Sequence, residues 1–314
     1  MAGQPFAHVP VLADEVLAWL QPRPGGLYLD GTVGGGGHAR LILEAAAPDG
    51  RLVGLDQDPD ALAAAEKNLS EFGARFIPRR GNFGDLQRHL AALQIEQVDG
   101  VLLDIGVSSH QLDSPERGFS FREDGPLDMR MDPDQARTAA DVLAAEDAAM
   151  LTKVFRDYGE ERWARRIARE VVRVREAQPL TSTRQLAELV SRVVPGGRGP
   201  QRIHPATRVF QALRIFVNSE LDRLREGLGE ASAALKPGAR LVVISFHSLE
   251  DRIVKHFFRD AAIDCICPPR LAVCSCDHRA LLKVLTRRGV RAAEAETKEN
   301  PRARSAVLRA VERL

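Results

Sequence analysis

The residues best suited to chemistry lie near the N-terminus, where carboxylates flank a run of glycines. Gly34–Gly37 follow an apolar segment at 27–29 and precede a helix-like segment. Glycines between a strand and a helix let a ligand approach the backbone at the helix N-terminus. Asp30 precedes the run, and Asp56 ends the next apolar segment, 22 residues after Gly34. This spacing predicts a nucleotide-type site in which the Asp56 carboxylate accepts hydrogen bonds from a ribose.

Two ligands fit this pattern. Gly34, Gly36 and Ala39 also satisfy the dinucleotide fingerprint of NAD(H). Asp30 would repel a pyrophosphate in a site of low dielectric, whereas S-adenosylmethionine has no phosphate and carries an ammonium and a sulfonium. The motif therefore favours S-adenosylmethionine over NAD(H), and a purely structural glycine turn is the third interpretation. Asp104 ends another apolar segment, where it is either a ligand contact or the cap of a turn.

Alternating strand-like and helix-like segments must position these residues. We expect strands at 27–29, 52–55, 75–78 and 100–103, and helices at 39–46, 60–69 and 86–93. Such alternation is typical of a parallel sheet covered by helices on both faces. After the middle of the chain the pattern predicts a helix at 206–228, a strand at 241–245, and a helix capped by Ser248 and Asp251. The segments 281–286 and 305–310 are expected to pair as an antiparallel hairpin.

The middle of the chain has a different character. Residues 111–135 are rich in Asp, Gly, Pro, Met and Arg, and we expect a long ordered loop there. A basic helix is expected within 159–176, and Ser182 with Gln185 predicts a capping box for the next helix. We therefore divide the chain into a discontinuous α/β domain at 1–110 and 207–314 and a helical insertion at 111–206.

Charge is distributed unevenly along the chain. Residues 1–150 hold 12 Lys and Arg against 24 Asp and Glu, and the remaining residues hold 32 against 19. An acidic half suits a cationic ligand and a basic half suits a phosphate backbone, although solvated helix faces explain the same counts. No apolar run approaches the roughly 20 residues needed to cross a bilayer, and no signal peptide is evident. We expect a cytoplasmic protein.

Four cysteines, Cys265, Cys267, Cys274 and Cys276, lie within 12 residues. This is not the scattered framework of a disulfide-stapled secreted domain. Because the Cys-x-Cys spacing is tighter than is usual for zinc ribbons, we interpret the cluster as reduced thiols in a loop, with a Zn²⁺ site as the alternative. No metal is expected to take part in the chemistry.

A set of short motifs makes the chain resemble a known family. They include His8–Leu12, Asp30–Thr32, Gly36–His38, Asp56–Pro59, Leu103–Ser109, Gln111–Asp113, Arg117–Phe121, Gly125–Asp132, Tyr158–Glu161, His204–Arg208, Val217–Glu220, Ser245–Arg252 and Asn300–Ser305. Together they resemble the RsmH (MraW) family, S-adenosylmethionine-dependent methyltransferases that form N4-methylcytidine in the 16S ribosomal RNA of the small subunit. The resemblance runs almost the full length of the chain. It departs at Gly35, where many relatives have Arg or a similar residue, and the cysteine segment occurs in only part of the family.

The resemblance implies a class I S-adenosylmethionine-dependent methyltransferase fold, Rossmann-like, with a seven-stranded mostly parallel sheet and an inserted helical domain. It also implies that the methyl-donor site is lined by Gly36, Gly37, His38, Asp56, Phe83, Asp104 and Gln111. An aromatic residue after the third strand, here Phe83, is suited to stacking on adenine. The implied substrate is a specific cytidine in the decoding region of 16S ribosomal RNA, on the assembled small subunit.

The substrate side of the site is read less directly from the sequence. The Pro-Pro-Tyr motif typical of amino methyltransferases is absent, and our candidates for catalytic contact are Ser108, Ser109, Asp128 and Arg130. Asp128 and Arg130 could instead form a salt bridge that orders the loop. Phe119 or Phe121 is expected to stack on an extruded base.

The remaining expectations concern partners and competing functions. The RNA-facing surface is expected to comprise the arginines of 162–173 together with Arg198, Arg202, Arg208 and the Arg-rich C-terminus. The oligomeric state is left open, with a homodimer as one possibility. The competing functions are an NAD(H)-dependent oxidoreductase and a non-catalytic RNA-binding ribosome-assembly factor. Retention of Asp56, Asp104 and Gln111 speaks against a donor site that has decayed.

Overall fold

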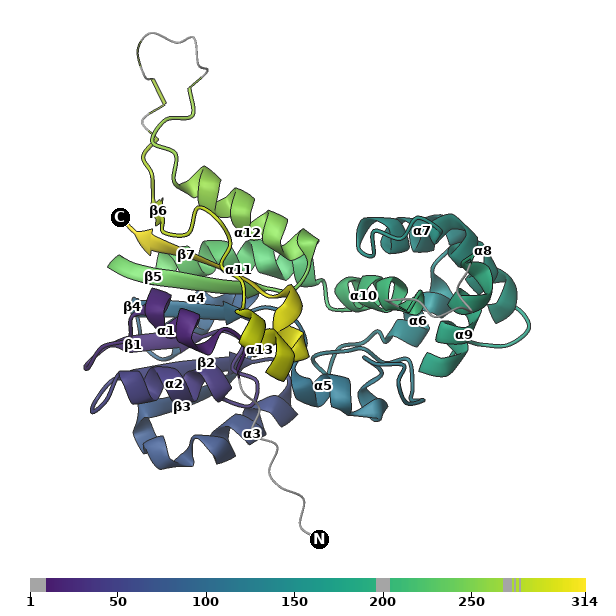
Figure 1. Ribbon diagram of the computed structural model, residues 1–314, viewed down its shortest axis with the longest axis horizontal. Coiled ribbons are helices and arrows are strands. Elements are labelled where there is room, and N and C mark those ends of the chain that lie inside the picture. Colours follow the sequence, from purple (N-terminus) through teal and green to yellow (C-terminus); the bar gives the residue numbers. More distant parts are fainter. Residues whose placement is uncertain (1–9, 196–203, 268–272, 274, 277) are drawn as a thin grey trace. The chain divides into compact units, whose positions relative to one another are not determined.

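The computed structural model describes residues 10–195, 204–267, 273, 275–276 and 278–314, with the side chain of Ser109 left out. The chain forms two compact units (Figure 1). Met1–Gly106 and Leu221–Leu314 make up the first, which we call the sheet unit, and Val107–Glu220 make up the second, the helical unit. Each unit has its own apolar core.

The sheet unit is built on a seven-stranded sheet of order β3-β2-β1-β4-β5-β7-β6. Its strands are β1 (Leu27–Asp30), β2 (Arg51–Asp56), β3 (Phe76–Arg80), β4 (Val98–Asp104), β5 (Leu235–Ser245), β6 (Leu282–Val284) and β7 (Val307–Arg313). β1 to β5 pair in parallel, whereas β7 is antiparallel to both β5 and β6. The expected seven-stranded, mostly parallel sheet is therefore confirmed, as is the antiparallel pairing of the last two strands.

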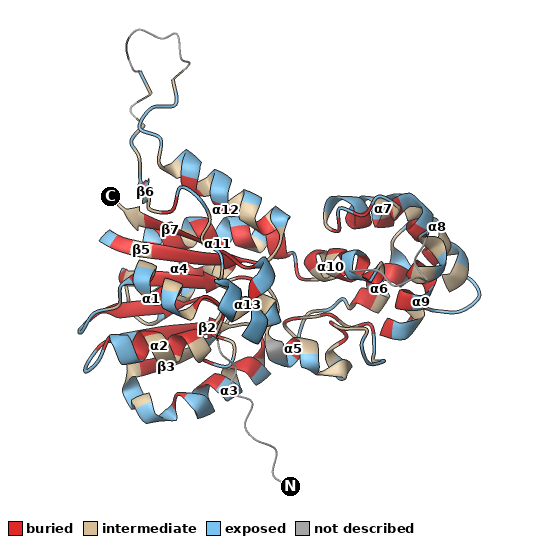
Figure 2. Ribbon diagram, viewed as in Figure 1, coloured by how far each residue is buried: buried red, intermediate tan, exposed pale blue. Residues whose placement is uncertain are grey.

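Helices cover both faces of this sheet, because its strands are apolar on both sides. Those of the sheet unit are α1 (Ala13–Leu20), α2 (Gly37–Ala45), α3 (Pro59–Asn68), α4 (Leu86–Ala92), α11 (Glu220–Ala234), α12 (Ser248–Ala261) and α13 (Glu294–Glu299). Along β1, Leu27 and Leu29 pack into one core with α4 and α11, and Tyr28 packs into the other with α1 and α2. Figure 2 shows the strands buried along most of their length. This is the burial expected for a parallel sheet.

The helical unit contains the long middle segment. Its helices are α5 (Ser109–Asp113), α6 (Ala139–Ala145), α7 (Ala148–Asp157), α8 (Ala164–Arg175), α9 (Thr183–Val193) and α10 (Ala206–Val217). Ser182 and Gln185 form the predicted capping box at the start of α9. The inner face of α8 buries Ile167 and Val171 in the core of the unit. Along the described part of the chain, no helix is both long and apolar enough to cross a bilayer.

Two expectations about the C-terminal half were wrong. The predicted helix at 206–228 is two helices, because Ser219 adopts a left-handed conformation with φ 49° between α10 and α11. α10 buries Val209 and Leu213 in the core of the helical unit, so that unit extends to Glu220 rather than ending at 206.

The predicted cap of α12 was also wrong. His247 caps this helix, forming a reciprocal capping box with Glu250. Ser248 is therefore the first helical residue and not the cap. The Asp251 carboxylate pairs instead with the Arg309 guanidinium of β7, at 2.7 and 3.1 Å.

Candidate functional site

Three carboxylates end three neighbouring strands of the sheet unit. Asp30 ends β1, Asp56 ends β2 and Asp104 ends β4. Asp30 is in register with Gly54 of β2 and Leu102 of β4, so these parallel strands finish at the same edge. Ligands of open α/β sheets bind at this edge, outside the carboxyl ends of the strands. The fold thus gathers acidic groups where a ligand is expected.

Asp30 is the most buried of the three, with 1% of its surface exposed. Its Oδ1 accepts a hydrogen bond from the Thr32 backbone N–H at 3.0 Å, and Thr32 Oγ1 accepts one from the Asp104 N–H at 2.7 Å. Thr32 therefore ties the end of β1 to the end of β4. Burial raises the pKa of Asp30 to about 7, against the lowering effect of His38 and of the Thr32 N–H.

Asp56 holds the glycine loop against the end of β2. Its Oδ2 accepts a hydrogen bond from the Gly34 N–H and its Oδ1 accepts one from the Asp58 N–H, both at 2.9 Å. Burial raises the pKa of Asp56 to about 6, although these backbone donors lower it in part. Each carboxylate oxygen retains a further acceptor position, so hydroxyl groups of a ligand have somewhere to bond.

The glycine loop needs glycine at two of its positions. Gly36 has φ 88° and forms the N-terminal boundary of α2, in a region that other residues rarely adopt. At Gly31 a Cβ atom would lie 2.5 Å from the Leu103 side chain, which is too close. The Gly35 carbonyl accepts a hydrogen bond from Asn68 Nδ2 at 3.0 Å, so the residue that departs from the family pattern is still held in place.

His38 is buried in the first turn of α2, beside Asp104. Its Nε2 lies 3.5 Å from Asp104 Oδ2. Within the described parts of the chain, three buried atoms of this pair have no hydrogen-bond partner. They are the two ring nitrogens of His38 and Asp104 Oδ1. Buried polar atoms without partners are rare in folded proteins and call for an explanation. A bound ligand group would supply the missing partners.

Phe83 follows β3, in a short 3-10 turn over Phe83–Asp85. A Cβ atom on Gly227 of α11 would lie 2.3 Å from its ring, so one side of the ring rests against that helix. Asn82 fixes the turn: its Oδ1 accepts from the Gly84 N–H at 2.8 Å, and its Nδ2 donates to Gln57 Oε1 at 2.9 Å. Sequence reasoning missed Asn82 and Thr32. An Asn two residues before a Gly is a turn signal that could have indicated the first.

In the helical unit, two of the predicted site residues cap a helix. The Ser108 hydroxyl accepts from the Gln111 N–H at 3.2 Å, and Gln111 Oε1 accepts from the Ser108 N–H at 3.1 Å. This reciprocal pair begins α5 directly after β4, and Gln111 is buried. The side chain of Ser109 lies outside the described residues.

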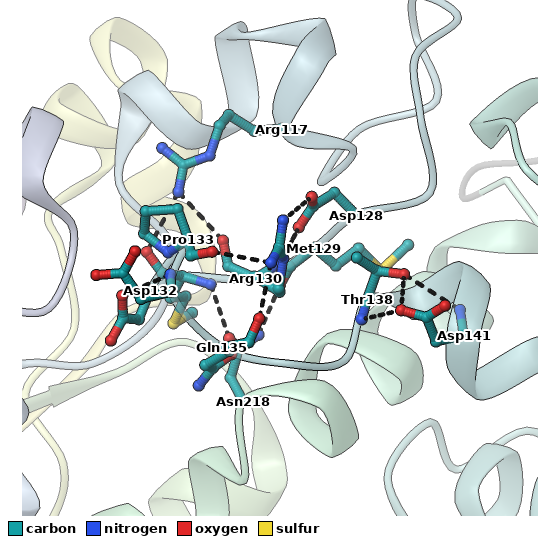
Figure 3. Close-up of polar contacts among 12 residues, drawn as sticks. Arg117, Asp128, Met129, Arg130, Asp132, Pro133, Gln135, Thr138, Asp141 and Asn218 are labelled. Carbon is teal, nitrogen blue, oxygen red and sulfur yellow. Dashed lines mark hydrogen bonds and ion pairs between the residues drawn. The ribbon is translucent and has the colours of Figure 1, made fainter.

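Asp128 and Arg130 form a salt bridge within the loop, as the alternative to a direct catalytic role predicted (Figure 3). Both carboxylate oxygens of Asp128 accept from the Arg130 guanidinium at 2.8 Å, and Arg130 Nη1 also donates to the carbonyls of Pro133 and Gln135. Burial pushes the pKa of Asp128 upward, but hydrogen bonds from Arg130 outweigh it and the pKa lies below its ordinary value. Asp128 is therefore ionised at neutral pH and a weak base.

Asn218 anchors the same loop from the end of α10 (Figure 3). Its Oδ1 accepts from the Met131 N–H at 2.8 Å, and its Nδ2 donates to the carbonyls of Met129 at 2.8 Å and Arg214 at 2.9 Å. Met129 has φ 62°, so the loop is held in a conformation that would otherwise be unfavourable. We refer to residues 128–135 as the Asp128 loop.

Two aromatic residues were expected to stack on a base. Phe119 is buried in the core of the helical unit, so the expectation is wrong for that residue. Phe121 is half-buried and packs against the rings of His204 and Phe210, each with a centroid distance of 4.8 Å. Stacking of a base on Phe121 stays a prediction.

Comparison with known proteins identifies the family. Residues 5–314 match the model of the MraW methylase family. The chain belongs to the MraW methylase family. A ribosomal RNA small subunit methyltransferase H of Syntrophotalea carbinolica is 61% identical over 314 residues, covering 100% of both chains. The protein of the same name from Trichlorobacter lovleyi is 57% identical over 309 residues, covering 98% of this chain and 99% of the relative.

Membership of the MraW methylase family accounts for the architecture. The chain has the class I S-adenosylmethionine-dependent methyltransferase fold, and the resemblance read from its short motifs is confirmed. The structure brings Gly36, Gly37, His38, Asp56, Phe83 and Asp104 together at one edge of the sheet unit, and it places Gln111, Ser108, Asp128 and Arg130 in the helical unit.

The raised pKa of Asp30 predicts that the stability of the protein depends on pH. Between the ordinary value of 3.8 and the folded value of about 7, folded Asp30 holds a proton that the unfolded chain releases. Ionised Asp30 therefore costs stability as the pH rises through this window. Relative to the wild type, Asp30→Asn is expected to gain on the order of a few kcal/mol in free energy of unfolding between about pH 4 and pH 7. Urea unfolding of the ligand-free protein at several pH values measures this, and a difference that does not vary with pH would contradict it.

The Asp128–Arg130 pair is expected to stabilise the loop of this MraW methylase. Both side chains are about 24% exposed and joined by two short bonds. A double-mutant cycle with Asp128→Ala and Arg130→Ala should give a coupling free energy of about 1–3 kcal/mol in urea unfolding. The exposed pair Arg156–Asp157 is the matched control and should show much weaker coupling, because solvent screens exposed charges. Equal coupling in the two pairs would show that the loop pair adds nothing.

Proposed function

We propose that the chain transfers a methyl group from S-adenosylmethionine to the N4 amine of a specific cytidine in the decoding region of 16S ribosomal RNA, with the small ribosomal subunit as substrate. The observation that carries the donor part is the acidic edge of the sheet unit. Asp30, Asp56 and Asp104 end adjacent strands there, and the two ring nitrogens of the buried His38 have no hydrogen-bond partner among the described residues. The ribosomal part is supported by the names of the relatives.

The acidic edge suits the charges of S-adenosylmethionine. Its ammonium and sulfonium groups are cationic, and carboxylates in a site of low dielectric attract them. We assign the ribose hydroxyls to Asp56. Other polar groups of the donor would bond to Asp104 and His38, whose buried atoms lack hydrogen-bond partners in the described parts of the chain. Phe83 would contact the adenine. Asp30 argues against NAD(H), because a carboxylate just ahead of the glycine loop would repel its pyrophosphate.

The reaction requires the amine to be positioned more than activated. The donor supplies a methyl group on a cationic sulfur, which is a good leaving group. The N4 lone pair forms the new N–C bond as the C–S bond breaks, the electron pair goes to sulfur, and N4 then loses a proton to water. Because the ring delocalises that lone pair, alignment by the protein could supply several kcal/mol. Asp128 is bonded to Arg130, so we propose that these two residues shape the loop that receives the cytosine rather than act as a base.

The exposed face of α8, together with Arg162 just before it, is our proposed contact with the RNA backbone. Arg162, Arg165, Arg166 and Arg169 are exposed, and the described residues provide no carboxylate partner for them. Arg173 differs, because it pairs with Glu170 at 2.7 Å. The guanidinium groups of Arg162 and Arg166 both lie over the Trp163 ring, at 5.6 and 5.3 Å, which leaves them displayed in fixed positions. Arg198 and Arg202 lie outside the described residues.

This surface predicts a salt effect. Replacing Arg165 and Arg169 together by Ala should make RNA binding less dependent on salt, lowering the slope of log K against log salt by about 1–2, because fewer counterions are released. Arg156→Ala is the control, since Arg156 is already paired with Asp157 at 2.8 Å. Filter binding at several salt concentrations gives the slopes. An unchanged slope in the double variant would remove α8 from the interface.

The proposed function is tested by transfer of labelled methyl from S-adenosylmethionine to small subunits that lack the modification, followed by nucleoside analysis. We expect label in N4-methylcytidine at a single position. Label in another nucleoside would refute the N4 assignment and keep the donor. Binding of S-adenosylmethionine without any labelled RNA would refute the substrate. Binding of NAD(H) in its place would refute the donor.

A further inference from the structure

The cysteine segment between α12 and β6 was interpreted from the sequence as reduced thiols in a loop. Cys265 and Cys267 follow the end of α12, and Cys276 lies shortly before β6. In Figure 1 the described residues on either side of this segment adjoin α12 and β6. The Sγ atoms of these three residues lie within 4.8 Å of one another. The thiols that follow α12 therefore lie close to the thiol that precedes β6.

The spacing of the sulfur atoms distinguishes the chemical alternatives. Cys265 Sγ and Cys276 Sγ are 3.8 Å apart. A disulfide requires an S–S distance of about 2.05 Å, so these two sulfur atoms are not bonded to one another. Two thiolates on a tetrahedral Zn²⁺, each with a Zn–S bond of about 2.3 Å, are separated by about 3.8 Å. The observed separation therefore fits two thiolates on a shared zinc ion, and it equally fits two thiols in contact.

Packing does not explain why these thiols meet. Among the described residues of this segment, Ile266 is 62% exposed and Val273 is 77% exposed. These two apolar side chains therefore provide no core that would hold the three sulfur atoms together. The Ser275 N–H also points at Cys267 Sγ, at 3.4 Å, and backbone donors of this kind support metal-bound thiolates.

We propose that Cys265, Cys267 and Cys276 bind one Zn²⁺ as thiolates. The ion fastens the segment between α12 and β6 where it leaves the sheet unit. Three protein thiolates occupy three corners of a tetrahedron, and water or one further ligand completes it. Cys274 lies outside the described residues, and the proposal does not require it. The zinc has no part in methyl transfer, so the proposal stands apart from the proposed function.

Metal content tests this directly. The full chain, without a histidine tag, is purified from cells grown with zinc, in buffers without chelator, and its metals are measured by mass spectrometry. We expect about one zinc per chain. Cys265→Ser and Cys276→Ser should weaken zinc binding by more than about 100-fold, because even residues that only support a ligand contribute about 10–100-fold. Ile266→Ala is the control, since it changes the same segment without removing a thiol, and it should retain the zinc.

Cobalt substitution guards against variants that fail to fold. Zinc-free wild-type protein titrated with Co²⁺ should develop the thiolate-to-cobalt charge-transfer band and the visible bands of tetrahedral cobalt. Their absence, together with well under about 0.1 zinc per chain, would overturn the proposal. A Cys265–Cys276 disulfide trapped from freshly lysed cells would overturn it also. Loss of zinc from the variants with methyl transfer unchanged is the combined result we expect.

Discussion

Asp56→Asn is expected to weaken the binding of S-adenosylmethionine by about 100-fold or more, because the carboxylate serves both the loop and the ligand. Its two oxygens accept the backbone N–H groups of Gly34 and Asp58, and an amide can accept only one of them well. The amide also removes negative charge from the acidic edge. Hydrogen bonds to charged groups contribute about 1.5–3 kcal/mol each, and two of them account for the expected loss.

Titration calorimetry with S-adenosylmethionine measures this effect. Glu66→Gln is the matched control, because it removes one negative charge from the exposed face of α3 directly after β2. It should bind the donor within about twofold of the wild type, as expected for a screened surface charge. Stability must be followed as well, and we expect Asp56→Asn to change it by about 1 kcal/mol or less, since removal of a buried charge offsets the lost bonds. Equal donor affinity in the two variants would mean that Asp56 is only structural.

Asn218→Ala is expected to cost about 2–4 kcal/mol in free energy of unfolding. The Asn218 side chain is 4% exposed and makes three hydrogen bonds to the backbone, two of them to the Asp128 loop. Alanine would leave the Met131 N–H and the Met129 carbonyl without these partners, and each buried unsatisfied group costs about 1–3 kcal/mol. The Asp128 loop would lose its anchor to α10.

Urea unfolding of the whole chain measures the effect of Asn218→Ala. Thr207→Ala is the control on the same helix, because Thr207 is exposed, and it should stay within about 0.5 kcal/mol of the wild type. A loss of less than about 0.5 kcal/mol in Asn218→Ala would show that water replaces the amide at the loop.

The strongly patterned parts of the fold were predictable from the sequence. β1, β2 and β4 are short apolar runs that end in a carboxylate, and the glycines after β1 leave few other conformations. The cap of α9 was also predictable, because Ser182 and Gln185 have the spacing and residue types of a capping box. In each case neighbouring residues alone determine the structure.

The misassigned elements depend on distant contacts. The apolar spacing at 206–228 continues unbroken because α10 and α11 both bury a face, each in the core of its own unit. Asn218 and Ser219 separate them, with Ser219 at φ 49°, and the sequence neighbours of Ser219 do not require that conformation. The cap at His247 was missed because His is not among the preferred N-cap residues, whereas Ser248 and Asp251 have the same spacing one residue later.

The site shows the same division. The chain order of strand, glycines and acid indicated Asp56, which the structure shows bonded to the Gly34 N–H of the glycine loop. Thr32 was invisible, since its hydroxyl bonds Asp104, which is 72 residues away. Phe119 was misread because an aromatic residue near a candidate site is more often core than contact, and here it is buried in the core of the helical unit. The meeting of Cys265 with Cys276 likewise depends on the path of the chain between them.

The helical unit enters the chain between two consecutive elements of the sheet unit, β4 and α11. All seven strands belong to the sheet unit, so its topology is complete without residues 107–220. The described residues of 107–220 thus interrupt the connection between β4 and α11 without adding a strand to the sheet, so the helical unit is a separate module at this point of the chain. Over evolutionary time the inserted module can be lengthened, trimmed or exchanged while the order of the strands is inherited unchanged. For the protein engineer, the same junction marks where a foreign recognition module can be grafted onto this scaffold.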